Sequence, residues 1–415
     1  MSTLQPHPRW TSAASETAEY IAKLLAAAAA VAITFTLART GVLRDVVTHP
    51  VVFCLTLDCY LIHICTGAGK KEAIGTTLLA AAGWLILPLA MRRPFAWPGE
   101  AVAAFGCLLG FASLLVLSVG ALVTHGEKGK DKLRTLGRAS VFICMAGFSV
   151  PFLAIMTAVR PERFDAFLYR FDAGFGFQPG FWMGRIFAAA PAFHNFEYYV
   201  YVSLALPVGL LYIGYIRHPR QWPLGFLQAV LSNSIIGYVL FWIFPAAGPG
   251  FAFAGRYPFQ APPLSALNLH PSVFTALPNA MPSVHVSTAL LVWFNSRPWP
   301  KARTLALAFL LLTIVSTLGL GEHYLVDVVV AFPYALAIQS LSVRHRARNR
   351  GLLLGAALTI AWFLLLRLGQ PVLPSAAIAY PAAAASIVYT LWEERNLAAV
   401  VFGRGSETMK TSPVL

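Results

Sequence analysis

Long apolar stretches recur along the chain, separated by short polar or basic segments. They cover residues 18–38, 50–66, 73–91, 100–124, 139–159, 193–216, 223–245, 282–296, 303–320, 323–343, 351–368 and 374–392. A helix needs about 20 residues to cross the hydrocarbon core of a bilayer, and most of these stretches have that length. The pattern therefore predicts an all-α, polytopic membrane helical bundle of about twelve spans.

Three segments depart from this pattern. The stretch 282–296 is shorter than a full span, and we expect its helix to begin within a buried, polar-lined site. Residues 160–192 mix Arg, Asp and many aromatic side chains, which is typical of a segment lying along the membrane interface. Residues 246–280 are rich in Gly, Pro and Ala and contain no long apolar stretch. We expect the last two segments on the same side of the membrane as the motifs described below.

The composition agrees with a membrane protein. Of the 415 residues, 58% are hydrophobic and only 12% are charged, whereas a soluble domain carries about 25% charged residues. The net charge of +14 does not indicate nucleic-acid binding, because the basic residues lie in separate short loops and form no single patch. The five cysteines lie inside apolar stretches without metal-ligand spacing, and we interpret them as small buried hydrophobic residues.

The loops also predict an orientation. Basic residues concentrate in alternate loops, for example 128–138 and 344–350, and the positive-inside rule then places both termini in the cytoplasm. The pair Arg92-Arg93 opposes this assignment. The stretch 18–38 follows a polar leader and is long enough to span, so we interpret it as a first membrane helix and not as a cleaved signal. The expected location is a plasma or inner membrane.

The first motif with chemical potential is Ala280-Met281-Pro282-Ser283-Val284-His285. Pro282 suits the first turn of a helix, because the N–H group that it lacks would have no partner there. The free N–H groups of such a turn, together with the helix dipole, bind anions such as phosphate. We expect Ser283 to add a hydroxyl donor and His285 to project toward the bound group.

The second motif is Gly321-Glu322-His323-Tyr324-Leu325-Val326-Asp327. His323 and Asp327 are four positions apart and share a face if they lie on one helix. The carboxylate is then expected to accept the Nδ1 proton of His323, which leaves Nε2 as a nucleophile. Since one apolar stretch enters and the next returns, both motifs should emerge on the same outer face. There, His323 would attack phosphorus while His285 protonates the leaving oxygen and then activates the acceptor.

These residues resemble a known family. Pro282-Ser283-Val284-His285 and His323-Tyr324-Leu325-Val326-Asp327 look like the last two signatures of the type-2 phosphatidic acid phosphatase superfamily. Residues 323–335 (HYLVDVVVAFPYA) and 244–250 (FPAAGPG) resemble the branch that contains inositol phosphorylceramide synthases and sphingomyelin synthases. The resemblance covers about residues 139–343, a six-span core. It implies that His285, His323 and Asp327 form a catalytic triad that needs no metal or other cofactor.

Two positions depart from the family pattern. The lysine of the first signature is replaced by Leu153, ahead of Arg160-Pro161, and the Ser-Arg pair before the last histidine is Ser316-Thr317. The synthase-like branch also relaxes these positions, so the resemblance favours transfer between lipids over simple hydrolysis. We expect Ser283 and Arg256 to bind the substrate phosphate instead, although Arg256 can also be an arginine facing lipid headgroups. Weaker candidates for the same role are Arg160, Arg163 and Arg170, for which headgroup binding is the simpler explanation.

Ionisable residues inside apolar stretches are functional candidates as well. Glu197 lies near the start of its stretch and is a possible residue of the site mouth. Asp58 and His63 are five positions apart and do not share a helix face well.

The sequence thus predicts an integral membrane lipid phosphotransferase or lipid phosphatase, inositolphosphotransferase-like, that acts through a phosphohistidine intermediate. Its partners are a phosphate-bearing lipid substrate and the bilayer, and no nucleic acid. The expected parts are N-terminal spans of unassigned role (1–138), a catalytic core (139–343), and C-terminal spans with a cytoplasmic tail (344–415). The alternatives are a multi-span lipid transporter, a zinc site formed by the triad, or a catalytically inactive lipid-binding relative. The lipid substrate, its acceptor and the oligomeric state stay open.

Overall fold

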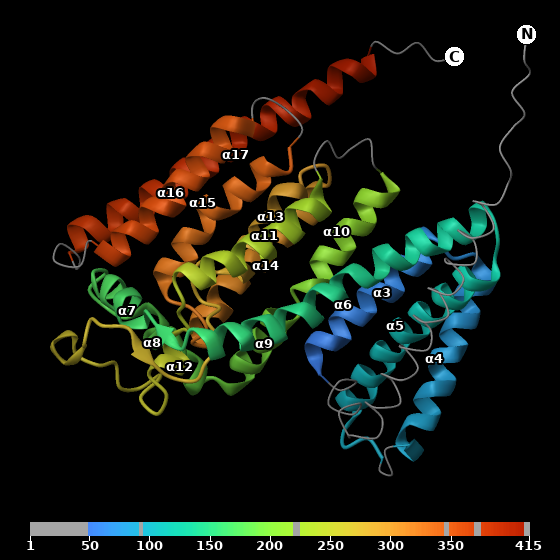
Figure 1. Cartoon of the computed structure of the whole chain (residues 1–415), viewed down its shortest axis with the longest axis horizontal. Coiled ribbons are helices and arrows are strands. Elements are labelled where there is room, and N and C mark those ends of the chain that lie inside the picture. The colour runs from blue at the N-terminus through green and yellow to red at the C-terminus, as the bar shows by residue number, and fades with distance from the viewer. Residues whose placement is uncertain (1–48, 91–93, 219–224, 344–347, 369–374, 411–415) are drawn as a thin grey trace, which may run out of the picture. The chain divides into compact units, whose positions relative to one another are not determined.

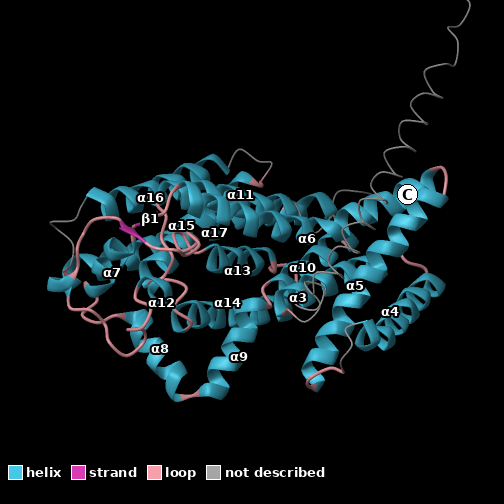
Figure 2. Ribbon diagram, turned by 60° about the horizontal axis from the view of Figure 1, so that its bottom comes forward, coloured by secondary structure: helices cyan, strands magenta, loops and turns pink. Residues whose placement is uncertain are grey.

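The computed structural model describes residues 49–90, 94–218, 225–343, 348–368 and 375–410. Within these ranges the protein is almost entirely helical, and Figure 2 shows the helices joined by loops with very little strand. Strands β1 (Glu162–Arg163) and β2 (Ser272–Val273) pair antiparallel, with Glu162 opposite Val273. The predicted first span, 18–38, and Arg92-Arg93 lie outside the described residues.

The predicted all-α membrane bundle is confirmed. In the described part of the chain, seven helical segments are long and apolar enough to cross a membrane: Lys70–Leu89, Pro98–Val123, Glu127–Val159, Pro191–Arg217, Phe226–Ile243, Pro300–Gly319 and Arg348–Leu368. Three shorter apolar helices accompany them: Pro50–Thr66, Val284–Asn295 and Leu325–Leu341. The total of about twelve spans stays a prediction, because one of the predicted spans is not described.

The chain divides into two compact units, Met1–Cys144 and Met145–Leu415. The described part of the first unit contains α3 (Pro50–Thr66), α4 (Lys70–Ala90), α5 (Pro98–Val123) and the first half of α6 (Glu127–Val159). Helices α3 and α5 pack closely at Gly110. A Cβ atom at this glycine would lie only 2.3 Å from the Thr56 carbonyl oxygen, so a larger residue would not fit there.

Buried polar residues lie inside the first unit. His63 does not pair with Asp58; its Nε2 lies 3.2 Å from Glu72 Oε1, and Lys132 donates to the same oxygen. Both carboxylate oxygens of Asp58 are buried without a hydrogen-bond partner among the described residues. The expectation of buried cysteines is correct for Cys54, Cys59 and Cys107, whereas Cys65 is partly exposed and Cys144 is exposed. A side chain that faces lipid is not covered by other residues of the same chain, so an apolar stretch can contain both buried and exposed cysteines.

The second unit begins with the second half of α6 and holds the predicted site. Its remaining helices are α7 (Asp165–Ala173), α8 (Pro179–Ala189), α9 (Pro191–Val202), α10 (Ala205–Arg217), α11 (Phe226–Ile243), α12 (Pro249–Ala252), the 3₁₀ turn η2 (Leu264–Ala266), α13 (Val284–Asn295), α14 (Pro300–Gly319), α15 (Leu325–Leu341), α16 (Arg348–Leu368) and α17 (Ala376–Lys410). Helix α15 packs against α13, α16 and α17 (Figure 1), and nearly all of its side chains are buried. It is therefore the central helix of this unit.

Two ion pairs hold α17 against the rest of the second unit. Arg297, which follows α13, makes a bidentate pair with the buried Glu394. Arg350 at the start of α16 lies 3.2 Å from Glu393. A planar guanidinium matches a carboxylate in this two-bond geometry, so α17 is fixed in register against the loop between α13 and α14.

The segment 160–192 forms β1 and two short helices, α7 and α8, of nine and eleven residues. Helices of this length are too short to cross a bilayer. Arg163 is fully buried, and its guanidinium donates to the carbonyl oxygens of Arg160, Glu162 and Ala276. These bonds use the donors of Arg163 to join the chain around β1 to the loop that follows β2. Arg163 is therefore not available to hold a phosphate.

Candidate active site

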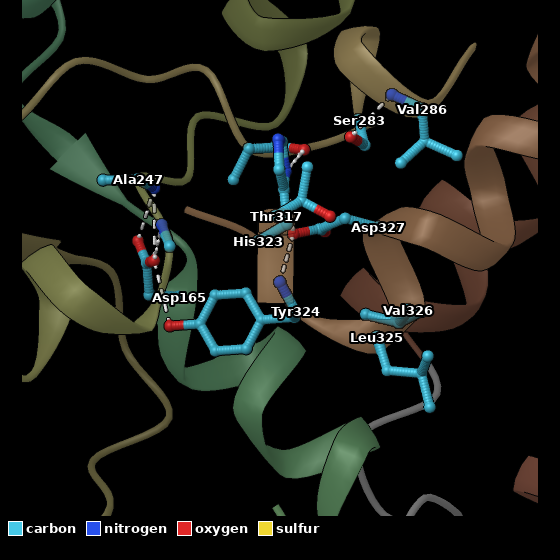
Figure 3. Close-up of polar contacts among 12 residues, drawn as sticks. Asp165, Ala247, Ser283, Val286, Thr317, His323, Tyr324, Leu325, Val326 and Asp327 are labelled. Atoms are coloured by element: carbon cyan, nitrogen blue, oxygen red, sulfur yellow. Dashed lines mark hydrogen bonds and ion pairs between the residues drawn. The ribbon is translucent and has the colours of Figure 1, made fainter. Parts of the chain in front are cut away.

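The first motif forms the beginning of α13, a helix of only 12 residues. Ser283 is its N-cap, and the Ser283 Oγ accepts a hydrogen bond from Val286 N at 3.3 Å. The helix therefore begins one residue after Ser283, and the expectation that Pro282 lies in the first turn is wrong. A serine is among the preferred N-cap residues, because its oxygen satisfies an amide of the first turn. The capping oxygen of Ser283 thus faces the backbone, as Figure 3 shows.

The second motif only partly follows the expected helix. Helix α15 begins at Leu325, so His323 lies just before it in the connection from α14. His323 N donates to the Thr317 carbonyl oxygen at 3.2 Å. Asp327 Oδ2 accepts a hydrogen bond from Tyr324 N at 2.8 Å, which caps the start of the helix. His323 and Asp327 therefore do not share a helix face, and their proximity comes from the turn that precedes α15.

The imidazole of His323 is oriented by the backbone. Its Nδ1 lies 2.9 Å from the carbonyl oxygen of Ala280. Asp327 Oδ2 lies 3.7 Å from the same nitrogen, beyond hydrogen-bond distance. Since a carbonyl oxygen can only accept, Nδ1 carries the proton and Nε2 holds the free lone pair. Nε2 is buried and has no hydrogen-bond partner in the described part of the chain.

The two histidines lie close together, as the topology predicted. Their ring centroids are 6.4 Å apart, with the planes at 60°. The His285 ring stacks on Tyr201 of α9, with centroids 4.1 Å apart and planes 18° apart. One phosphate can therefore be contacted by both imidazoles. The role of Tyr201 was not expected from the sequence, because no motif links residue 201 to residue 285.

Burial sets the protonation of the residues before α15. It lowers the pKa of His323 to about 4, against the raising effect of the Ala280 hydrogen bond. The imidazole is therefore neutral at physiological pH, as a nucleophile must be. Burial also raises the pKa of the neighbouring Glu322 to about 7. This carboxylic acid changes its charge near neutral pH, directly beside His323.

Two further carboxylates reach this region from α7. Asp165 accepts hydrogen bonds from Gly248 N at 2.9 Å and from the Tyr324 hydroxyl at 3.0 Å. Asp172 accepts from Leu325 N at 2.7 Å and from Val326 N at 3.0 Å. Burial raises the pKa of Asp165 to about 7, although the hydrogen bonds that it accepts act in the opposite direction. No pattern in the sequence indicates either residue, because more than 150 positions separate each from its partners on the second motif.

The remaining predicted residues lie in different surroundings. Arg256 is exposed in the loop after α12, and no contact joins its side chain to either histidine in the described structure. Glu197 is fully buried on α9, one turn before Tyr201, and its carboxylate oxygens have no hydrogen-bond partner among the described residues. At the departures from the family pattern, Leu153 packs in an apolar cluster with Tyr238 and Phe241. Thr317 is buried and uses its carbonyl oxygen to hold His323 N.

No set of three or more His, Cys, Asp or Glu side chains within the described ranges is arranged to hold a metal ion. The two histidines of the site offer acid–base and nucleophilic chemistry. His323 can donate an electron pair from Nε2, and His285 can exchange a proton with a group bound between the rings. The first turn of α13 can bind an anion through N–H groups that have no partner within the helix.

Comparison with curated proteins and with solved structures gives no match. A match to a protein family nevertheless covers the segment from α7 to the end of α15, which contains both histidines and Asp327. Residues 166–341 match the family model of the PAP2 superfamily.

Proposed function

We propose that the protein is an integral membrane lipid phosphatase or lipid phosphotransferase whose phosphoryl group passes through His323. The observation that carries this proposal is the unpartnered Nε2 of His323, which lies in a buried site with the His285 ring centroid 6.4 Å from its own. The PAP2 superfamily match and the apolar helices support the same chemistry. The proposed catalytic core is the segment 139–343.

In the first step, Nε2 of His323 attacks the phosphorus of a lipid phosphate and forms an N–P bond. The P–O bond to the leaving group breaks, and His285 gives the departing oxygen a proton that it takes up when the anionic phosphate binds beside its ring. In the second step, His285 takes a proton from water or a lipid hydroxyl group. The acceptor oxygen forms a bond to phosphorus, the N–P bond breaks, and His323 is restored.

Asp327 then has an electrostatic role. The ring of His323 gains positive charge when Nε2 bonds to phosphorus, because Nδ1 keeps its proton. Asp327 Oδ2 lies 3.7 Å from Nδ1 and would stabilise this charge in a buried setting. The hydrogen bond to Ala280 O fixes the ring, so positioning and charge stabilisation fall to different groups.

The phosphate would bind at the first turn of α13. Helix N-termini bind anions through free N–H groups and the helix dipole, and His285 is the second residue of this helix. Glu197 would lie at the mouth of the site, on the same face of α9 as Tyr201. The proposed role of Arg256 is to bind the approaching headgroup from its exposed loop. We place this site on the non-cytoplasmic side, with both termini in the cytoplasm.

Transfer to a second lipid is the form of the reaction that the sequence favours. Residues 323–335 resemble inositol phosphorylceramide and sphingomyelin synthases, and the two cationic positions of the hydrolytic family pattern are Leu153 and Thr317. The acceptor in that case is a lipid alcohol, and the donor is a glycerophospholipid.

The test is incubation of the purified protein in detergent with phospholipids labelled in the phosphate, with and without a diacylglycerol or ceramide acceptor. Free phosphate released without an acceptor identifies a phosphatase, whereas a new labelled lipid identifies a transferase. An alkaline quench should retain label on the wild-type protein and none on His323→Ala. Turnover by His323→Ala at the wild-type rate would refute the proposal.

A further inference from the structure

Helix α7 directs two buried carboxylates toward the segment that carries His323. Asp165 and Asp172 are 3% and 1% exposed and stand seven positions apart, two helical turns, so they share one face of the helix. Neither belongs to the predicted triad. Both make their hydrogen bonds outside their own helix, and Figure 3 shows the partners of Asp165 next to the site.

Asp172 caps α15 from another helix. Its Oδ2 accepts from Leu325 N and its Oδ1 from Val326 N, at 2.7 and 3.0 Å. These amides belong to the first turn of α15 and have no partner within that helix. A carboxylate is the preferred group at this position, since it also interacts favourably with the helix dipole. The start of α15, two residues after His323, is therefore set by α7.

Asp165 holds the residue that follows His323. Its Oδ1 accepts from the Tyr324 hydroxyl at 3.0 Å and from Gly248 N at 2.9 Å. The loop at Gly248 contacts the same segment, because Gly250 N donates to the Gly321 carbonyl oxygen at 2.8 Å. Asp165 thus binds Tyr324 directly, and the loop that it also binds contacts Gly321 on the other side of His323.

The same contacts distinguish the two helix N-termini at the site. The Asp172 carboxyl group occupies the first-turn amides of α15. The first turn of α13 is capped only by the neutral Ser283 hydroxyl. The first-turn amides of α15 are therefore already occupied, whereas the first turn of α13, on the side of His285, can still bind an anionic phosphate.

We infer that Asp165 and Asp172 are positioning residues for His323: they fix the backbone of residues 324–326 and thereby the direction from which Nε2 meets the phosphorus. This inference rests on the proposed function. A displacement of about 1 Å in a reacting group can lower a rate by about 100-fold, so two anchors adjacent to the nucleophile have a large effect on the chemical step.

The experiment is rapid-quench kinetics of phosphoenzyme formation with full-length protein in detergent and a phosphate-labelled lipid. The variants are Asp172→Asn and Asp165→Asn, and the control is Glu162→Gln, an exposed carboxylate three residues before Asp165. The burst amplitude counts the molecules that are folded and active, and the rate constant reports the geometry of the attack. We expect each Asp variant to retain its amplitude while its rate constant falls about 10- to 100-fold, and the control to match the wild type.

The outcomes separate the two proposals. A loss of amplitude with an unchanged rate constant in both Asp variants would mean that these residues only support folding, and it would overturn the inference. Wild-type rate constants in both variants would also overturn it and leave the proposed function intact. If the wild-type protein forms no phosphoenzyme and turns over no lipid phosphate, the proposed function fails and this inference fails with it. Because Asp165 and Asp172 contact different amides, one variant can decide the question if the other does not fold.

Discussion

The rings of Tyr201 and His285 stack almost in parallel, with centroids 4.1 Å apart and planes 18° apart. Helix α9 thereby contributes the ring that packs against His285, the proposed general acid. An offset or parallel aromatic pair contributes about 0.5–1.5 kcal/mol beyond the area that it buries. The stack restricts the ring of His285 to one plane and keeps it facing His323.

Replacing Tyr201 tests this restriction. Tyr201→Phe keeps the stacked ring, so its kcat should stay within about threefold of the wild type. Tyr201→Ala removes the ring and should lower kcat about tenfold, because His285 can then leave the productive orientation. Both are measured as turnover of labelled phospholipid in detergent. Equal kcat values for the two variants would show that the stack does not matter.

The triad residues should differ in the size of their effects. His323→Ala should abolish phosphoenzyme formation, since no other group carries the N–P bond. His285→Ala should slow phosphoenzyme formation by about 10²–10⁴, the usual contribution of a general acid. The exposed His270 provides the control, and His270→Ala should behave as the wild type.

Asp327→Asn should be milder than His323→Ala. The hydrogen bond that orients His323 goes to the Ala280 carbonyl oxygen and survives this change. What is lost is the negative charge 3.7 Å from Nδ1. We expect a fall in kcat of about 10- to 100-fold, equivalent to about 1.4–2.7 kcal/mol. A loss as complete as that of His323→Ala would instead show that Asp327 is needed to hold the ring.

Glu322 should make substrate binding depend on pH. Burial raises the pKa of this residue to about 7, so the side chain is neutral below that pH and negative above it. A negative charge beside His323 repels an anionic phosphate, and KM should therefore rise as the pH increases through 7. Glu322→Gln should remove this rise, which steady-state kinetics between pH 6 and about 8.5 can detect. Glu127→Gln, an exposed carboxylate of the other unit, should keep it.

Gly248 is required by the backbone beside the site. Its φ is +95°, and a Cβ atom there would lie 2.3 Å from the Glu322 carbonyl oxygen. Gly248→Ala should lower the free energy of unfolding by about 1–3 kcal/mol and reduce kcat, because residues 321–323 must move. Thermal unfolding in detergent measures the first effect. Gly147→Ala is the control, since a Cβ at Gly147 meets nothing within 4 Å, and a similar loss in both would contradict the explanation.

The apolar pattern and the two motifs were sufficient to predict the fold class and the meeting of His285 with His323. Hydrophobic spans of the right length alternate across a bilayer, so two motifs separated by a pair of such spans can be expected at the same end of the bundle. The short length of the helix after Pro282 was also predictable, because its apolar stretch ends early.

The contacts that orient His323 were not predictable. The hydrogen bond from its Nδ1 goes to the backbone carbonyl oxygen of Ala280, 43 positions away. Every residue has such a carbonyl group, so no sequence pattern can identify this acceptor. Helix α15 begins at Leu325 and not at His323, and its first amide donates to Asp172, 153 positions away. Periodicity describes one helix at a time, whereas these contacts depend on how distant segments pack.

The shortness of α13 bears on the depth in the bilayer at which the proposed reaction would take place. Twelve residues extend about 18 Å, against a hydrocarbon thickness of about 30 Å. If its far end, near Arg297, reaches one surface, a phosphate at its first turn lies about 12 Å below the other. The phosphate of a lipid substrate must then move inward from the headgroup layer and lose part of its hydration. At that depth the concentration of water as a phosphoryl acceptor is low, whereas the hydroxyl group of a neighbouring lipid can reach the site by lateral diffusion.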